Sequence, residues 1–449
     1  SEESYTQITQ DLEQIGYLQN SIRPLSFLKF CVYLPHRPGA LYDFLGLTTG
    51  ACANISFLDF DDKGRHPDRL TVSLNLEQGV IVGRLLDLLK SLYRLEIIEY
   101  DTTGDKLDDT VFYVRYAQAI RELIGESEDH FLLSFLADTN HMAQELMDRG
   151  KDPKKVFESV LASGRTMRAT SGRNFYADVQ KFAVDNHTTL FCFQVPCGGN
   201  IFVIKSDENL LLIDTGYGIY HADIMAMLSR YGMGDINKIR CIVVTHADAD
   251  HCGGAGFFPA PALMHNSTLE IIRTNNRAYG SRSDHASLDE FYTKMINLFS
   301  KFNIPKTTEC LAGPGDKNRG IFPVIGRITI GDVDLEILDG FNGHTAGQVF
   351  LYSRTYGLLF AADSVINFAS LSQERADYSS LAAFLVTSVN VDSGNAKKER
   401  TGLLELAHET DTFLASSGRR CMICGGHGAV SVLDGGKLVA IGDIERYIP

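Results

Sequence analysis

Apolar and polar residues are spaced differently in three zones of the chain. Between residues 28 and 100, strand-like apolar runs alternate with two segments whose apolar residues recur at helical spacing. The predicted order is strand, helix, strand, strand, helix, strand, which is that of a ferredoxin-like βαββαβ domain. Residues 106–185 have mostly helical spacing, and Gly125, Gly150 and Gly164 stand where helices are expected to end.

From residue 187 onward, short apolar strands alternate with helical segments again. Three short strands precede a helix at 221–232, and an apolar strand follows at 238–246. This alternation is typical of an α/β domain. We therefore predict an α+β multidomain protein with a leader at 1–27, the ferredoxin-like domain at 28–103, a helical connector at 104–186 and the α/β domain at 187–449.

Composition and charge narrow the class of protein. Lys and Arg number 42 against 56 Asp and Glu, which gives a net charge of −14. Such a surface repels nucleic-acid phosphates and anionic lipids, so we expect neither nucleic acid nor a membrane as partner.

No apolar run approaches the roughly 18 residues that span a bilayer, and the polar N-terminus is unlike a signal peptide. The nine Cys residues form no disulfide framework, which predicts reduced thiols and a cytoplasmic protein.

Ligand-type side chains are concentrated directly after the strand at 238–246. The sequence there is THADADHCGG, with His246, Asp248, Asp250 and His251 inside it. Side chains two residues apart in an extended segment point the same way, so His246 and Asp248 are expected to share one metal. Asp250 and His251, beyond the bend, are then placed for a second metal. The alternative is an acidic surface loop with two incidental histidines.

Three further ligand-type residues stand at the ends of other predicted strands. His344 precedes a strand in GFNGHTAGQVFLY, Asp363 ends the next strand in GLLFAADS, and His427 follows a strand in CMICGGHGAV. In α/β proteins the ends of strands are where sites are built. Their coincidence with the THADADH run favours a metal site over a surface loop.

Five motifs together resemble those of the metallo-β-lactamase superfamily. They are LLLIDTGYG, THADADHCGG, HTAGQ, FAADS and GGHG, in that order across residues 187–440. The resemblance implies an αββα sandwich with a dinuclear metal site. By position it implies first-metal ligands His246, Asp248 and His344, second-metal ligands Asp250, His251 and His427, a bridging carboxylate at Asp363, and a supporting, non-coordinating Asp214.

One position departs from the superfamily pattern. Most members have His where this chain has Asp248. A carboxylate adds negative charge and a hard oxygen ligand, which shifts preference from zinc toward iron or manganese. A glutamate fills this position in the flavodiiron branch. We therefore expect two divalent metal ions, with Zn, Fe and Mn all open.

The resemblance implies a hydrolase acting on a thioester, ester or phosphoester of small-molecule size. Its nucleophile would be a hydroxide bridging the two metals, with Asp250 orienting it as the catalytic carboxylate. Two alternatives stay open. One is a di-iron oxidoreductase of flavodiiron type acting on O2 or NO, which Asp248 motivates. The other is a non-catalytic metal-containing sensor of a metabolite.

Residues 28–100 resemble an ACT domain, the small-molecule sensor of many enzymes of amino-acid metabolism. The resemblance rests on LPHRPGALYDFL and ACANISFLDF and on the βαββαβ order. It implies a homodimer or higher oligomer and an amino-acid effector. The alternative is a module that only dimerises. The implied effector-binding residues are Arg37, Gly39, Asn54 and Ile55.

Weaker candidates lie elsewhere in the chain. The polar stretch 273–302 is predicted either to form a lid, with Arg273, Arg277 or Arg282 meeting an anionic substrate, or to be a surface insertion. Other residues are expected to carry no chemistry: Cys252 and the Cys421-x-x-Cys424 pair as core thiols, and His265 and His285 as histidines outside the ligand motifs.

Overall fold

The computed structural model describes residues 26–51, 53–60, 68–76, 79–101, 110–124, 139, 142–143, 145–147, 150–281, 286–311, 315, 317–381 and 389–449. The predicted leader, most of a predicted helix at 130–150, Arg282 and His285 lie outside these residues. No helix among the described residues is both long enough and apolar enough to cross a membrane. The chain divides into two compact units, Ser1–Val114 with Asp129–Pro153, and Arg115–Glu128 with Lys154–Pro449.

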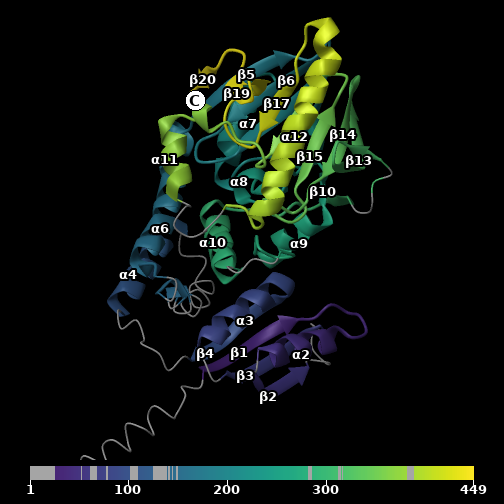
Figure 1. Ribbon diagram of the computed structural model, residues 1–449. Helices are drawn as coiled ribbons and strands as arrows, with labels where there is room; N and C mark the ends of the chain where they lie inside the picture. Colours follow the sequence, from purple (N-terminus) through teal and green to yellow (C-terminus); the bar gives the residue numbers. More distant parts are fainter. Residues whose placement is uncertain are drawn as a thin grey trace, which may run out of the picture. The chain divides into compact units, whose positions relative to one another are not determined.

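The first unit contains one antiparallel sheet with the strand order β2-β3-β1-β4. Phe30 and Val32 of β1 share an apolar core with Phe44 of α2 and Leu86 of α3, so both helices pack against this sheet (Figure 1). The elements follow one another as β1 (Ser26–Tyr33), α2 (Ala40–Gly50), β2 (Asn54–Phe60), β3 (Arg69–Leu76), α3 (Gly79–Leu92) and β4 (Arg94–Asp101).

The second unit contains two sheets, each of eight described strands. The first has the order β11-β10-β9-β8-β7-β6-β5-β20 and the second the order β12-β13-β14-β15-β16-β17-β18-β19. The first sheet comprises β5 (Ala177–Ala183), β6 (Thr188–Gln194), β7 (Asn200–Ser206), β8 (Asn209–Ile213), β9 (Ile239–Val243), β10 (Ala262–His265), β11 (Thr308–Leu311) and β20 (Glu445–Tyr447). The second comprises β12 (Asn318–Arg319), β13 (Phe322–Ile330), β14 (Val333–Asp339), β15 (Val349–Ser353), β16 (Leu358–Ala362), β17 (Met422–Gly425), β18 (Ser431–Asp434) and β19 (Lys437–Ala440).

The two sheets pack face to face through a common apolar core. Leu190 and Cys192 of β6 meet Leu358 and Phe360 of β16 in it, and alternate residues of each strand point the other way. On the outer face of the second sheet, α12 (Ser393–Leu414) packs with Leu403 against β14 to β17 (Figure 1). The remaining helices of this unit are α4 (Thr110–Ile124), α6 (Pro153–Ala169), α7 (His221–Arg230), α8 (Ala249–Cys252), α9 (Asn266–Thr274), α10 (Ala286–Phe299) and α11 (Gln373–Leu381).

The structure adds a strand to residues 106–185, which were predicted to be mostly helical, and lengthens one helix. Ala177–Ala183 forms β5, which pairs with β6 and β20. Gly164 was expected to end a helix, but α6 continues to Ala169. A Cβ at Gly164 would lie 2.7 Å from the ring of Phe299. This glycine therefore lets the helix approach a phenylalanine ring, a role that its sequence neighbours do not reveal.

Backbone hydrogen bonds join the two sheets at one edge. Val349 N at the start of β15 donates to Thr245 O after β9, over 2.9 Å, and Asn200 N donates to Gly426 O after β17, over 2.6 Å. Gly426 N in turn donates to Ala362 O at the end of β16, over 2.7 Å. The loops that follow β9, β16 and β17, and the loop before β15, are thereby held close together.

Candidate metal centre

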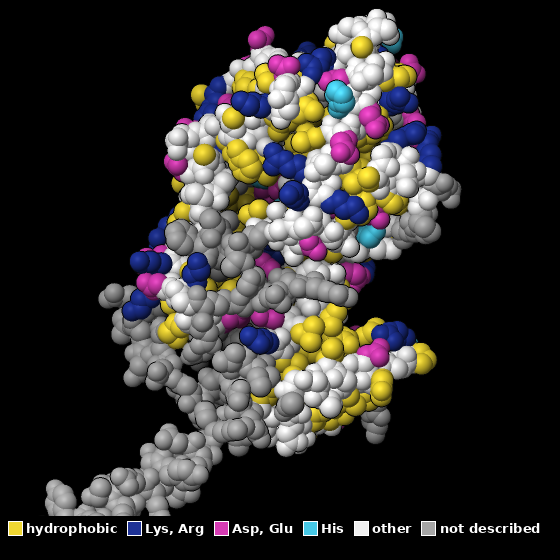
Figure 2. Space-filling view, in the orientation of Figure 1, with side chains coloured by type: hydrophobic (Ala, Val, Ile, Leu, Met, Phe, Trp, Pro, Cys, Tyr) yellow, Lys and Arg dark blue, Asp and Glu magenta, His cyan; other side chains and the backbone are white. Residues whose placement is uncertain are grey.

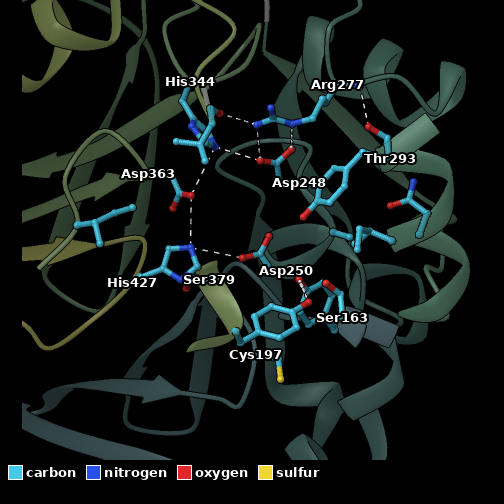
Figure 3. A pocket seen from close by; sticks show the side chains of 18 of the residues that line it. Ser163, Cys197, Asp248, Asp250, Arg277, Thr293, His344, Asp363, Ser379 and His427 are labelled. Carbon is cyan, nitrogen blue, oxygen red and sulfur yellow. Dashed lines mark hydrogen bonds and ion pairs between the residues drawn. The ribbon is translucent and has the colours of Figure 1, made fainter. Parts of the chain in front are cut away.

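The seven predicted ligands lie together at this edge of the second unit. Candidate ligand atoms lie within 4.8 Å of one another in three overlapping groups. The groups are His246–Asp248–His344, Asp250–His251–His427 and His246–His251–Asp363. Figure 3 shows His344 beside Asp248, and His427 beside both Asp250 and Asp363.

The first group gathers around one oxygen of Asp248. Oδ2 of Asp248 lies 3.0 Å from Nε2 of His344 and 3.7 Å from Nε2 of His246. Two ligand atoms that share one metal at about 2.0–2.2 Å are themselves about 3.0–3.5 Å apart. The spacing of the group is therefore close to that of a coordination shell.

The second group gathers around Asp250 in the same way. Oδ2 of Asp250 lies 3.4 Å from Nε2 of His427 and 3.6 Å from Nε2 of His251. Asp363 faces both groups. Its Oδ1 is 3.2 Å from Nε2 of His251, and its Oδ2 is 3.3 Å from Nε2 of His427 and 3.4 Å from Nε2 of His344. Asp363 thus has the position required of a bridging carboxylate.

Asp214, predicted to support the site, fixes the orientation of two histidines. Its carboxylate accepts hydrogen bonds of 2.8 Å from Thr245 N, Thr245 Oγ1 and His251 Nδ1. Because the Thr245 hydroxyl donates its proton to Asp214, it accepts one from His246 Nδ1 over 2.9 Å. Both rings therefore carry a proton on Nδ1 and turn Nε2 toward the site.

His344 is oriented by a different partner. Its Nδ1 lies 3.0 Å from Oδ1 of Asn390, and an amide oxygen can only accept. Its proton is therefore on Nδ1, and Nε2 is left for the site. Asn390 lies outside the ligand motifs, so this contact could not be predicted from them.

Three buried atoms at the centre have no hydrogen-bond partner among the described residues. They are Nε2 of His246, Nε2 of His251 and Oδ1 of Asp363. An unsatisfied buried polar atom costs about 1–3 kcal/mol, a cost that a bound cation would remove. A Cβ at Gly426 would overlap Oδ1 of Asp363, and one at Gly199 would overlap the His251 ring. Four imidazoles and three carboxylates suit divalent transition metals, so the residues fit the metals that the motifs imply.

The pKa values of the predicted ligands shift in both directions. Neighbouring carboxylates outweigh burial and raise the pKa values of His251, His344 and His427, and burial raises the pKa of Asp250. Burial lowers the pKa of His246 well below its usual value, so its imidazole is neutral. Burial by itself raises the pKa of Asp248, but Arg277 and His344 outweigh it and hold that pKa well below the usual range. In the same way His427 and His251 outweigh burial at Asp363, whose pKa is also well below its usual range. The carboxylates of Asp248 and Asp363 are therefore ionised.

Arg277 was a candidate to bind an anionic substrate, but in the structure it pairs with a predicted metal ligand instead. Its Nε lies 3.2 Å from Oδ1 of Asp248 and its Nη2 3.0 Å from Oδ2, and Nη2 also donates to Val389 O over 2.8 Å (Figure 3). The side chain is buried and occupied by these contacts. Arg273 instead pairs with Glu270 on the exposed side of α9. Neither arginine is free to meet an anionic substrate.

The family follows from a comparison of the sequence with known families. A family model described as the metallo-beta-lactamase superfamily matches residues 195–427, more than half of the chain. The chain belongs to this superfamily. The superfamily predicted from the five motifs is therefore confirmed. Its members bind divalent metals, which agrees with the groups of His and Asp described above.

Solved structures are similar to the same part of the chain. The DIM-1 metallo-beta-lactamase is 15% identical over 56% of this chain and 90% of its own, with a TM-score of 0.32. A metallo-beta-lactamase from Pontibacter korlensis is 14% identical over 56% and 92%, with a TM-score of 0.33. The chemotaxis sensor ODP, solved as a peroxy diiron species, is 13% identical over 56% and 88%, with a TM-score of 0.31. No curated protein matches the chain.

A buried glutamate outside the superfamily motifs joins two of the ligand loops. Glu399 of α12 is fully buried, and its Oε1 accepts hydrogen bonds from Phe341 N over 2.7 Å and Gly343 N over 3.0 Å. Its Oε2 accepts one from the hydroxyl of Ser364 over 2.8 Å. Glu399 thereby ties the loop of His344 to the residue that follows Asp363. A glutamate in an amphipathic helix gives no sequence signal for such a role.

We expect Glu399→Ala to weaken metal binding about 10-fold or more, because partners outside the ligand shell typically contribute 10–100-fold. Competition with a chromophoric chelator measures the affinity. Glu405→Ala, an exposed glutamate of the same helix, is the matched control and should bind metal like the wild type. Equal affinities in the two variants would contradict the role of Glu399.

The weaker candidates behave as structural residues. Cys252 is buried, and burial raises the pKa of its thiol well above the usual value, so it is not a reactive thiolate. Cys421 and Cys424 are free, buried thiols, and burial raises the pKa of Cys421 to about 12. His265 precedes α9, where its Nδ1 accepts a hydrogen bond of 3.1 Å from Ser267 N.

Proposed function

We propose that this member of the metallo-β-lactamase superfamily is a dinuclear metal-dependent hydrolase. The observation that carries the proposal is the pair of ligand groups that share the carboxylate of Asp363. In the proposal His246, Asp248 and His344 hold one metal, Asp250, His251 and His427 hold the other, and Asp363 bridges them.

Two divalent cations there would supply Lewis acidity, both to activate water and to stabilise negative charge on a carbonyl or phosphoryl oxygen. The protein's part is orientation. Asp214 and Thr245 hold the rings of His246 and His251, and Asn390 holds that of His344. Asp250 lies beside both His251 and His427, where its carboxylate can orient the attacking water. No serine or cysteine nucleophile is then required.

The test is metal content together with turnover. Protein purified without chelator should carry two metal ions per chain and hydrolyse at least one member of a panel of esters, thioesters and phosphoesters. Dialysis against a chelator should abolish this activity, and metal should restore it. Full activity in metal-free protein would overturn the proposal.

A di-iron oxidoreductase acting on O2 or NO is the second candidate. It is favoured by Asp248, a hard oxygen ligand where most of the superfamily has imidazole. Iron as the predominant metal, with consumption of O2 or NO by the reduced protein, would support it. Predominant zinc with hydrolysis would exclude it. A protein that holds two metals but turns over neither class of substrate would instead be a sensor.

We also propose that residues 28–100 form an ACT-like domain that binds an amino acid and assembles the chain as a homodimer or higher oligomer. The strand order β2-β3-β1-β4 with two helices supports it. Gly39, with φ of 85°, is the residue before α2, and apart from its chain neighbours no atom lies within 4 Å of where its Cβ would stand. A ligand carboxylate could therefore approach the first amides of this helix, where the helix dipole favours an anion.

Two of the proposed effector residues are exposed, and apolar surface accompanies them. Arg37 forms an exposed ion pair of 2.7 Å with Asp43, and Asn54 is exposed at the start of β2. Figure 2 shows apolar side chains gathered on the surface of this unit. Contiguous apolar surface marks interaction sites, which supports assembly. The large exposed apolar residues there are Tyr42, Phe57, Leu58, Phe60, Leu88, Leu92 and Ile98.

We expect one or more of the twenty amino acids to raise the melting temperature, and Asn54→Ala to abolish that shift by removing a side chain that both donates and accepts hydrogen bonds. Differential scanning fluorimetry measures the shift, and kinetics with the hit then tests coupling, for which about 1–3 kcal/mol is typical. Asp59→Ala, an exposed residue farther along β2, is the control. No shift from any amino acid in a dimeric protein would leave the module as an assembly device.

A further inference from the structure

The metal centre adjoins a pocket whose lining combines the predicted ligands with apolar and tyrosine side chains. The pocket has a volume of about 200 Å³. Five of the predicted ligands line it (Figure 3). The apolar and tyrosine residues of the lining include Tyr217, Tyr292, Ile296, Phe368, Leu371 and Tyr378.

The pocket offers no free positive charge among the described residues that line it. Arg277 is the only Lys or Arg of that lining, and its guanidinium is bonded to Asp248 and to Val389 O. An anionic group held away from the metals would therefore find no free cation among the described residues that line the pocket. Desolvating such a charge without a partner is costly.

Tyr292 differs from the other two tyrosines of the pocket. The hydroxyls of Tyr217 and Tyr378 lie 3.0 Å apart and satisfy each other. The hydroxyl of Tyr292 forms no hydrogen bond with the described residues. The phenol is thus a hydrogen-bond donor on the pocket lining that has no partner among the described residues.

Resting on the hydrolase proposed above, we propose that the substrate is a small, uncharged carboxylic ester or thioester with a short apolar acyl group, and that Tyr292 donates a hydrogen bond to its carbonyl oxygen. The acyl group packs against Ile296, Phe368 and Leu371. Water adds to the carbonyl carbon, the C–O or C–S bond breaks, and the leaving oxygen or sulfur takes the proton that the water loses. A phosphodiester, whose charge stays on the substrate throughout, fits this pocket poorly.

The first test compares two substrates with one leaving group. Metal-reconstituted protein should have a kcat/KM for p-nitrophenyl butyrate at least 100-fold above that for bis(p-nitrophenyl) phosphate. Tyr292→Phe should lower the ester value about 10-fold or more, since one donor to a developing oxyanion contributes that much or more, with unchanged metal content. Tyr356→Phe, in the turn between β15 and β16 away from the pocket lining, is the matched control. A preference for the phosphodiester would overturn the substrate class but leave the hydrolase in place.

The second test does not depend on turnover. Butyrophenone, an uncharged ketone that cannot be hydrolysed, should bind by calorimetry several-fold more weakly to Tyr292→Phe than to wild type or Tyr356→Phe. Phenylphosphonate should bind only when metal is present, because the described residues that line the pocket supply no free cation for it. If protein with two metals hydrolyses no member of the ester, thioester and phosphoester panel, the hydrolase proposal fails, and the ketone titration still decides the role of Tyr292. Equal ketone affinity in wild type and Tyr292→Phe would overturn that role.

Discussion

Replacing Asp363 with alanine is expected to release both metals, or at least to uncouple them, and to lower turnover by a factor of about 100 or more. Asp363 is the carboxylate whose oxygens reach both ligand groups, at 3.2 Å from His251, 3.3 Å from His427 and 3.4 Å from His344. Removing Asp363 also takes away the negatively charged carboxylate that all three of these imidazoles contact. Metal analysis of protein purified without chelator, alongside kinetics, measures both effects.

Two further variants separate the bridge from the fold. Asp363→Asn keeps the size of the side chain but removes its charge, and it should lose metal nearly as completely as the alanine variant. Asp332→Ala changes an exposed aspartate in the turn between β13 and β14 and should keep both metals. Full metal occupancy with near-normal turnover in Asp363→Ala would remove Asp363 from the site.

The sequence was sufficient where function depends on short, local motifs. An apolar strand followed by THADADHCGG predicts a loop of ligands at a sheet edge, and β9 with the loop to α8 is that loop. The strand-end positions of His344, Asp363 and His427 were predicted for the same reason. Each prediction needs only the alternation of strand and loop, which a period-two pattern records.

The sequence was insufficient where a side chain meets a partner from a distant element. Arg277 lies 29 residues from Asp248, and Glu399 lies 56 residues from Gly343. Both are charged residues that a sequence pattern assigns to the surface, whereas each is buried and bonded at the site. Gly164 is a similar case, because only the packing of Phe299 explains it. Which distant residue a side chain contacts depends on tertiary packing, and the neighbouring residues in the sequence do not indicate it.

The second large effect is expected at Asp248, where the choice of metal should change. Asp248→His restores the ligand that is common in the superfamily and should raise the proportion of zinc relative to iron and manganese. It also removes the nearer of the two carboxylates that, among the described residues, pair with the buried guanidinium of Arg277, at 3.0 Å, and leaves only Asp289 at 3.8 Å. Losing one partner of a buried ion pair is destabilising. The single variant should therefore melt at a lower temperature and hold less metal in total.

Asp248→His combined with Arg277→Met removes the guanidinium whose pairing the single variant weakens and keeps a long, apolar side chain in its place. The double variant should recover stability and total metal while keeping the higher proportion of zinc, because metal preference follows the ligand and stability follows the pair. Metal analysis after growth with equal zinc, iron and manganese, and thermal melts, measure the two separately. Arg273→Met, on the exposed side of α9, is the control. If the proportion of zinc stays the same or falls in both variants, Asp248 does not coordinate the metal, and Arg277 serves only to neutralise a buried carboxylate.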